Sequence, residues 1–330
     1  MEPLVSSIFN INSPAEFRQV ALDVFYFQAQ TNKVYSKYLS GLRVVPNNVT
    51  EIEQIPFLPI EFFKSHTVIS EKYSERDIQE VFTSSGTSGM AQSKHYVADL
   101  SIYQQSYQKA FELFYGSIDE CCILALLPSY LERDGSSLIY MADDLIKKSR
   151  HPDSGFYLNN SDELISKIKQ LESKNQKTIL LGVTYALLDL IEKETFQLKK
   201  TIVMETGGMK GKRKEMVREE LHALLCEGFG VDVIHSEYGM TELLSQAYSK
   251  GKGVFKCPPW MNVIIRDTND PLSILPATRS GGINIIDLAN INSCSFIATQ
   301  DLGKTFPDGS FEVLGRFDNT DIRGCNLLVQ

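Results

Sequence analysis

The chain has 330 residues, of which 43% are hydrophobic and 22% are charged, and its formal net charge is −8. This length and composition suit one large α/β unit with a substantial core, and the negative charge argues against a nucleic-acid-binding protein, which carries a basic excess. The six cysteines form no C-x-x-C pair, so no zinc site is expected. Neither a signal peptide nor an apolar run long enough to cross a bilayer is visible, and we expect a reduced, cytoplasmic protein without a membrane span.

The N-terminal part is expected to be helical. Ser13 is followed by Pro14 and, three positions after the serine, by Glu16. This is a capping box with proline at the first helical position. Apolar residues between Phe17 and Val24 then recur at helical spacing. Residues 41–60 contain several prolines and asparagines and are expected to form a loop. We assign residues 1–75 to an N-terminal helical cap.

Strands and helices alternate in the middle of the chain. Helices are expected at Tyr103–Tyr115, from Asn160 onward and at Tyr185–Ile191, and strands at Ile123–Leu127, Thr178–Gly182, Thr201–Met204 and Val231–Ile234. This order is typical of a largely parallel sheet whose active site lies at the carboxyl ends of the strands. We assign residues 76–253 to an α/β core within a single domain of residues 1–330.

The last part of the chain has a different texture. Short strands are expected at Val263–Arg266, Gly282–Asp287, Ser295–Ala298 and Phe311–Leu314. No linker separates them from the preceding core. Residues 254–330 are therefore expected to form a β-rich lobe and a C-terminal tail of the same domain.

A loop of glycines and hydroxyl residues runs from Phe82 to Gly89. Gly86 and Gly89 allow the backbone to turn tightly and bring its N–H groups up to an anion. Hydroxyl donors for phosphate oxygens are supplied by Thr83, Ser84, Ser85, Thr87 and Ser88. The preceding β-forming residues place the loop at a strand end, and the spacing does not fit a Walker A loop. The loop therefore indicates a phosphate site, with an ordinary polar turn as the alternative.

Two distant segments extend this chemistry. One is Tyr238-Gly239-Met240-Thr241-Glu242, and the other combines Asp301 with Gly315-Arg316-Phe317-Asp318. In order and spacing, the three motifs resemble the phosphate loop, the aromatic-Gly-x-Thr-Glu motif and the last N-terminal-domain motif of adenylate-forming enzymes. The resemblance implies the large N-terminal domain of that fold, with mainly parallel sheets, packed helices and a β-rich C-terminal lobe.

Further segments resemble the LuxE-type acyl-protein synthetases, which are relatives of the phenylacetate-CoA ligases. They are Ile55–Lys64, Leu243-Leu244-Ser245-Gln246, Pro258-Pro259-Trp260-Met261 and Arg323-Gly324-Cys325. The resemblance implies a ligase that uses ATP and Mg²⁺ to convert a fatty or other carboxylic acid into acyl-AMP, with release of pyrophosphate.

The resemblance also implies roles for the phosphate-binding residues. The β- and γ-phosphates would be held by Ser84, Ser85, Gly86, Thr87, Ser88 and Gly89. Lys94 would add a point charge, and because it stands two residues further out than is common, His95 is an alternative cation. Thr241 would contact the α-phosphate, and Glu242 would ligate the Mg²⁺.

The nucleoside would meet a second group of residues. By resemblance, Tyr238 would stack on adenine beside Gly207, Gly208 and Gly239, Asp301 would accept hydrogen bonds from the ribose hydroxyls, and Arg316 would lie nearby. Structural alternatives are a core tyrosine, a turn aspartate and a surface ion pair. His235 is a weaker candidate for contact with the acyl carboxylate, with a core histidine as the alternative.

Complete adenylate-forming ligases continue into a small subdomain with a catalytic lysine, which is expected to be lacking here because the chain stops at Gln330. In the LuxE-type enzymes the acyl group passes to a cysteine, and Cys325 stands at the matching place. Arg323 favours the thiolate form of Cys325, whereas a buried strand cysteine is the structural alternative.

The expected partner is an aldehyde-forming reductase. Two further hypotheses are a ligase that transfers directly to CoA or an acyl carrier protein, and a non-catalytic nucleotide-binding scaffold.

Overall fold

The structure is a computed structural model that describes residues 2–84, 91–128, 135–158, 160–207, 213 and 216–317. Its α-helices are α1 (Glu2–Ile8), α2 (Pro14–Thr31), α3 (Lys33–Gly41), α4 (Phe62–Ser65), α5 (Leu100–Tyr115), α6 (Ser137–Ser149), α7 (Ser161–Ser173), α8 (Thr184–Lys193) and α9 (Arg218–Phe229). Its strands are β1 (Leu58–Pro59), β2 (Glu80–Thr83), β3 (Lys94–Val97), β4 (Cys122–Leu126), β5 (Gly155–Phe156), β6 (Thr178–Val183), β7 (Thr201–Thr206), β8 (His235–Tyr238), β9 (Ala247–Ser249), β10 (Val254–Lys256), β11 (Met261–Arg266), β12 (Ser280–Asp287), β13 (Phe296–Thr305) and β14 (Phe311–Arg316). Within these described ranges, no helix is long and apolar enough to cross a bilayer.

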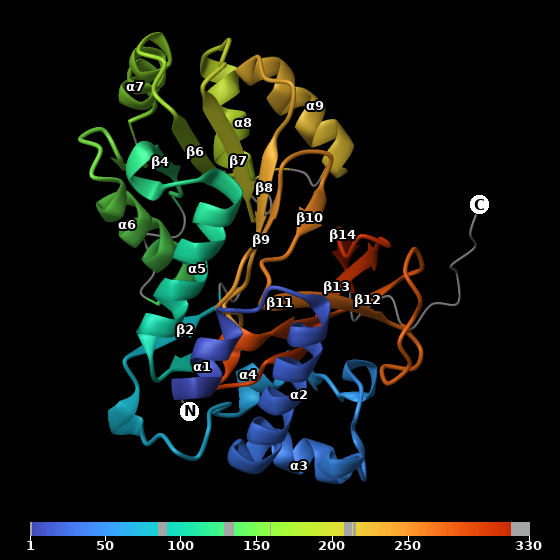
Figure 1. Ribbon diagram of the computed structural model, residues 1–330. Coiled ribbons are helices and arrows are strands. Elements are labelled where there is room, and N and C mark those ends of the chain that lie inside the picture. The colour runs from blue at the N-terminus through green and yellow to red at the C-terminus, as the bar shows by residue number, and fades with distance from the viewer. Residues whose placement is uncertain are drawn as a thin grey trace.

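One long sheet connects the two halves of the molecule. Its strand order is β11-β12-β13-β14-β10-β9-β8-β7-β6-β4-β5, with β1 paired to β13. The strands from β5 to β8 along this order pair in parallel, and the strands from β8 to β11 pair antiparallel. Figure 1 shows the parallel strands in the upper part of the molecule and β11–β14 below them. The expected fold class, a largely parallel sheet with packed helices followed by a β-rich part, is confirmed.

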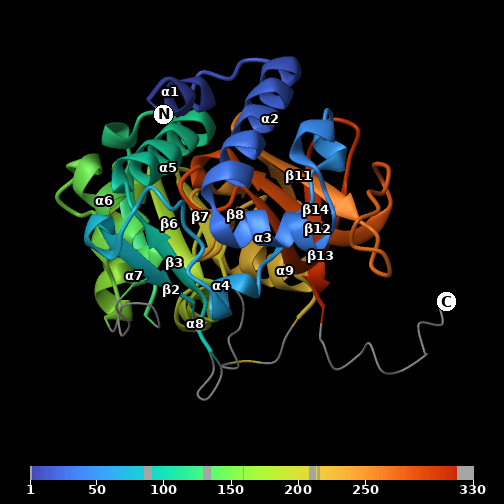
Figure 2. The same cartoon turned by 90° about the horizontal axis from the view of Figure 1, so that it is seen from below.

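Helices cover both faces of the parallel strands. α5 and α6 pack on one face, where α6 contacts β4, and α8 and α9 pack together on the other, where α8 contacts β6 and β7. Figure 2 shows the strands between these two groups of helices. Because β4, β6, β7 and β8 are parallel, their carboxyl ends meet at one edge of the sheet, which is where α/β proteins place their sites.

The expected strand at Val231–Ile234 is wrong, since the strand beside β7 is β8, which begins at His235. α9 ends at Phe229, and Gly230 follows it in the left-handed conformation with φ 64°. The next residues form the connection, and pairing with β7 starts only at Met204↔His235. The β-branched residues of this connection suggested a strand, but the register with β7 decides where the strand lies.

Buried polar side chains tie the N-terminal helices to the β-rich part. Ser13 caps α2 as expected, because its hydroxyl accepts the N–H of Glu16. Further along α2, the fully buried Gln28 donates from Nε2 to the carbonyl of Asn290 over 2.9 Å and accepts the N–H of Ser295 over 2.9 Å. With both ends of its amide paired, Gln28 fixes the segment 290–295 against α2. The expected loop at residues 41–60 lies beside these helices and contains short 3-10 turns and β1.

Candidate active site

The glycine-and-hydroxyl loop connects β2 to β3, which form an antiparallel hairpin in which Thr83 pairs with Lys94. The N–H of Ser84 donates to the carbonyl of Ser93 over 3.1 Å, and the N–H of Ser93 donates to the Ser84 hydroxyl over 2.9 Å. The loop therefore leaves a strand end, as expected, and Ser84 closes its base. The other predicted phosphate ligands of the loop, Ser85, Gly86, Thr87, Ser88 and Gly89, lie outside the described residues.

His95 joins this hairpin to the segment that carries Thr241. The His95 ring is 1% exposed, its Nδ1 donates to the Thr241 carbonyl over 3.0 Å, and its Nε2 then accepts the hydroxyl of Ser293, 2.9 Å away. Burial lowers the pKa of His95 to about 4, so the ring is neutral at neutral pH. The interpretation of His95 as an alternative cation is therefore wrong; the ring positions the Thr241 backbone.

The carboxyl group of Glu242 lies next to the base of the loop. Glu242 is 5% exposed and forms a hydrogen bond with Ser93, while Asn290 donates to its backbone carbonyl over 2.7 Å. Burial raises the pKa of Glu242, and Ser93 and the positive charges of Arg316 and Lys64 act in the opposite direction. A desolvated carboxyl between hydrogen-bond donors and cations is a suitable ligand for a hard divalent ion.

Lys94 does not share the side of β3 that faces Glu242. Side chains alternate along a strand, and Ser93 and His95, on either side of Lys94, both reach the Thr241–Glu242 segment. Lys94 itself is exposed. Its contact with phosphate stays a prediction.

Lys64 is a cation that sequence reasoning did not assign to the site. It lies on α4, and its charge lowers the pKa of Glu242. Two contacts hold α4 in place: the ring of Phe63 packs edge-on against His95 with centroids 5.6 Å apart, and Glu61 accepts a hydrogen bond of 2.6 Å from Gln300. The signal was present in the segment Ile55–Lys64, but only the fold brings that segment to Glu242.

Tyr238, Asp301 and Arg316 meet although they are far apart in the sequence. The hydroxyl of Tyr238 donates to Asp301 Oδ2 over 2.7 Å, and Arg316 Nε lies 3.4 Å from Asp301 Oδ1. The register pairs Asp301 on β13 directly with Arg316 on β14. The Tyr238 ring packs against Phe255 and Phe311, with centroids 5.8 Å and 5.5 Å away. Burial raises the pKa of Asp301. The hydrogen bond from Tyr238 and the positive charge of Arg316 lower it. The three residues proposed to meet the nucleoside thus form one cluster.

Two predicted glycines lie at the adjoining edge of the sheet. Gly207 follows Thr206 at the end of β7 and has φ 67°, a conformation that favours glycine. Thr206 pairs with Glu237, so Gly207 and Tyr238 continue at the same edge. At Gly239, a Cβ atom would lie 2.5 Å from Glu237 Oε1, so a larger residue there would displace the end of the Glu237 side chain. Gly208 lies outside the described residues.

His235 is not part of this cluster. His235 is the first residue of β8, three positions before Tyr238, and its Nδ1 lies 3.3 Å from the hydroxyl of Tyr115. Burial lowers the pKa of His235 to about 4, which agrees with the alternative of a core histidine. Cys325 lies outside the described residues, as does Asp318 of the last motif.

Comparison with known proteins supports the resemblance that the motifs indicate. Residues 5–132 match the family model described as acyl-protein synthetase, LuxE. A relative from Photorhabdus luminescens, named long-chain-fatty-acid–luciferin-component ligase, is 33% identical over 73 residues, which is 22% of this chain and 60% of the relative. The chain therefore spans less than two thirds of that relative. The chain resembles the LuxE-type acyl-protein synthetases, as expected.

Solved structures show the same fold at low sequence identity. ATP-bound MatB from Rhodopseudomonas palustris superposes with a TM-score of 0.54 at 17% identity, over 75% of this chain and 50% of MatB. An open conformation of 2-hydroxyisobutyryl-CoA ligase with 2-HIB-AMP and CoA superposes with a TM-score of 0.67 at 12% identity, over 94% of this chain and 72% of the ligase. At these identities the likeness establishes the fold alone, which this chain shares with MatB and 2-hydroxyisobutyryl-CoA ligase.

Proposed function

We propose that this protein activates a fatty or other carboxylic acid with MgATP. A carboxylate oxygen attacks the α-phosphorus of ATP, a new O–P bond forms, and the bond between the α-phosphorus and the bridging oxygen of pyrophosphate breaks. In a second step the thiolate of Cys325 attacks the acyl carbon, the acyl group becomes a thioester, and AMP leaves with the carboxylate oxygen. The thioester then delivers the acyl group to a partner reductase.

The observation that carries the first step is the hydrogen bond between His95 and Thr241. It joins the hairpin of the phosphate loop to the aromatic-Gly-x-Thr-Glu motif across 3.0 Å. Ser93 reinforces this junction through the carboxyl of Glu242. Adenylation depends mainly on positioning and on neutralising phosphate charge, and a junction of these two motifs holds both kinds of group together.

Mg²⁺ fits the residues present. Glu242 offers a buried carboxyl. Burial raises the pKa of this carboxyl, and nearby positive charges lower it. Among the described residues no group of three or more His, Cys, Asp or Glu side chains forms a cage, which suits an ion that keeps several waters and binds through one or two carboxylates and the substrate phosphates. When bound, Mg²⁺ would screen phosphate charge. Glu242 would orient it and Thr241 would contact the α-phosphate.

The nucleoside is assigned to the cluster of Tyr238, Asp301 and Arg316. Asp301 is positioned by the Tyr238 hydroxyl and by its pairing with Arg316, so its carboxyl oxygens are fixed before a diol arrives. The fatty-acid class follows from the name of the P. luminescens relative. The thioester step rests on the resemblance of the Arg323-Gly324-Cys325 segment.

The test is the intact mass of the protein after incubation with Mg²⁺, ATP and a panel of fatty and aryl acids. We expect an ATP-dependent gain of one acyl group that hydroxylamine removes and that Cys325→Ser abolishes. Pyrophosphate release without an adduct would replace the second step by direct transfer to CoA or an acyl carrier protein. ATP binding without pyrophosphate release from any acid would overturn the proposal in favour of a nucleotide-binding scaffold.

A further inference from the structure

The backbone that carries Glu242 is buried without belonging to a strand. The segment 241–245 lies between β8 and β9, and its residues from Glu242 to Ser245 are at most 5% exposed. A buried backbone outside a ladder needs other hydrogen-bond partners. Side chains of the turn at residues 287–293, where β12 ends, reach this segment at three points.

Asp287 makes the largest contribution to this junction. It is the last residue of β12 and is fully buried. Its Oδ2 accepts the N–H of Leu244 over 2.8 Å and that of Ser245 over 2.9 Å, and its Oδ1 accepts the Ser245 hydroxyl over 2.5 Å. Oδ1 also accepts the N–H of Ala289 over 3.1 Å, within the turn itself. Burial raises the pKa of Asp287 to about 6, and these bonds lower it, so the group is a carboxylate at pH 8 and accepts from all four donors.

Two further residues of the turn act on the same segment. Asn290, also fully buried, donates from Nδ2 to the carbonyl of Glu242 over 2.7 Å. The hydroxyl of Ser293 lies 2.9 Å from Nε2 of His95, whose Nδ1 donates to the Thr241 carbonyl. The turn therefore holds the backbone before Glu242, at Glu242 and after it.

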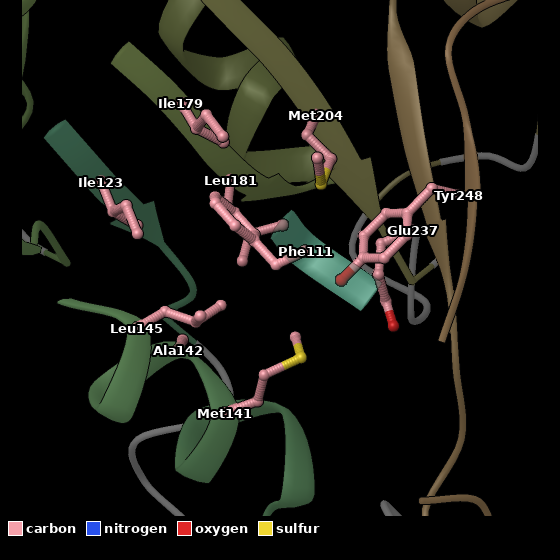
Figure 3. A pocket seen from close by; sticks show the side chains of 10 residues that line it. All are labelled: Phe111, Ile123, Met141, Ala142, Leu145, Ile179, Leu181, Met204, Glu237 and Tyr248. Carbon is pink, nitrogen blue, oxygen red and sulfur yellow. The ribbon is translucent and has the colours of Figure 1, made fainter. Parts of the chain in front are cut away.

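A second anchor lies on the other side of Ser245. Its hydroxyl is 2.9 Å from the Ser106 hydroxyl on α5 and accepts the indole N–H of Trp260 over 3.1 Å. α5 is itself packed on the sheet, and Figure 3 shows Phe111 of this helix and Leu181 of β6 lining one small cavity. The segment 241–245 is thus held between a turn that α2 fixes and a helix that the sheet fixes.

We propose that Asp287 is a positioning residue for the metal ligand. By fixing the segment 241–245, it holds the Glu242 carboxyl in the orientation that binds Mg²⁺, and Asn290 assists from the same turn. This inference rests on the proposed function. Mg²⁺ requires a near-ideal octahedral geometry, so a carboxyl on a backbone that shifts binds the ion less tightly. Groups that orient a metal ligand without touching the ion typically contribute about 10–100-fold to metal affinity.

The experiment measures metal binding, apart from turnover. Mn²⁺, a paramagnetic substitute for Mg²⁺, is titrated by electron paramagnetic resonance at pH 8 with α,β-methylene-ATP and without an acid. Glu242→Gln gives the loss that follows when the ligand itself is missing. Asp287→Asn should weaken Mn²⁺ binding about tenfold or more, because the amide nitrogen cannot accept a hydrogen bond. Asn290→Ala should act in the same direction, and it decides the question if Asp287→Asn does not fold.

Glu172→Gln is the matched control. Like Asp287, Glu172 accepts three backbone N–H groups and one hydroxyl, which come from Lys199, Lys200 and Thr201. These donors lie at the amino end of β7, opposite the edge of the sheet that carries the candidate active site. Both carboxyl variants are expected to lower the melting temperature, but only Asp287→Asn should weaken Mn²⁺ binding.

The outcomes separate this inference from the proposed function. Unchanged Mn²⁺ binding in the folded Asp287 and Asn290 variants would overturn the inference. An equal loss in Glu172→Gln would also overturn it, because the effect would then follow from stability alone. Wild-type protein that binds Mn²⁺ but releases no pyrophosphate with any acid would overturn the proposed function, while the variants still decide the inference. Wild-type protein that binds no Mn²⁺ with the analogue would overturn both.

Discussion

The hydroxyl of Tyr238 and the carboxylate of Asp301 are joined by a 2.7 Å hydrogen bond across 63 residues of sequence. The bond connects β8, in the parallel part of the sheet, to β13, in the antiparallel part. It therefore joins two motifs that the sequence presents separately, and it orients the carboxylate proposed to receive the ribose.

Tyr238→Phe removes this bond while keeping the ring between Phe255 and Phe311. A hydrogen bond to a charged group contributes about 1.5–3 kcal/mol, so we expect a loss of that order in the free energy of unfolding and a several-fold rise in KM for ATP. Asp301→Ala should raise KM for ATP more strongly, because it removes the acceptor itself. Denaturant unfolding and steady-state kinetics measure both effects. Unchanged KM for ATP in Asp301→Ala would remove Asp301 from the nucleotide site.

Glu242→Gln keeps the shape of the side chain and its hydrogen bond with Ser93 but removes the charge that would ligate Mg²⁺. Adenylation is expected to fall about 10³-fold, which corresponds to about 4 kcal/mol in the activation barrier. ATP–pyrophosphate exchange, measured against Mg²⁺ concentration, tests this. Because the variant no longer buries an ionisable carboxyl, its melting temperature should not fall. Near-normal exchange would exclude Glu242 as a metal ligand.

Lys64 and Lys94 make different predictions. Lys64 acts electrostatically on Glu242, whereas Lys94 is exposed and its side of β3 is opposite to that of His95. Lys64→Ala should lower kcat/KM for ATP by about tenfold, the effect of one phosphate-directed charge, and Lys64→Arg should restore much of it. Lys94→Ala is the matched comparison and should have the smaller effect. A larger loss in Lys94→Ala than in Lys64→Ala would return the role to the loop lysine.

His95 predicts a feature of the pH profile. Burial holds its pKa at about 4, so the ring does not titrate between pH 6 and pH 8 and adds no inflection there. His95→Asn should lower kcat by displacing Thr241, since the amide cannot reach Thr241 and Ser293 with the same geometry as the ring. The profile of kcat against pH should keep its shape in this variant. A missing inflection near pH 6.5 in His95→Asn would contradict a neutral, positioning His95.

Glu237 predicts how stability depends on pH. Its folded pKa is raised from 4.5 to about 7, so the folded state binds more protons than the unfolded state between these values. The associated stabilisation is complete below the unfolded pKa and is lost as pH rises through about 7. Relative to Glu237→Gln, the wild-type free energy of unfolding should fall by up to about 3 kcal/mol between pH 5 and pH 8. Denaturant unfolding at several pH values measures the difference, and parallel curves for the two proteins would contradict it.

Local signals in the sequence were sufficient for the fold class and for most elements. The cap at Ser13, the cap at Asn160 and the strand at Thr178–Gly182 depend on neighbouring residues, and the structure has all three. The strand expected at Val231–Ile234 failed because its true position depends on pairing with β7, which is a long-range contact. Propensity does not specify register.

The motifs likewise supplied candidate site residues, since the chemistry of glycine, hydroxyl and carboxylate side chains can be recognised in order along the chain. Only the tertiary structure decided how they face. It placed His95 and Ser93, rather than Lys94, toward Thr241 and Glu242, and it brought Lys64 to the same point from the N-terminal helices. It also buried Glu237, whose carboxyl accepts a hydrogen bond from Thr206. Side-chain direction and desolvation arise when distant elements pack together, and a local pattern contains neither.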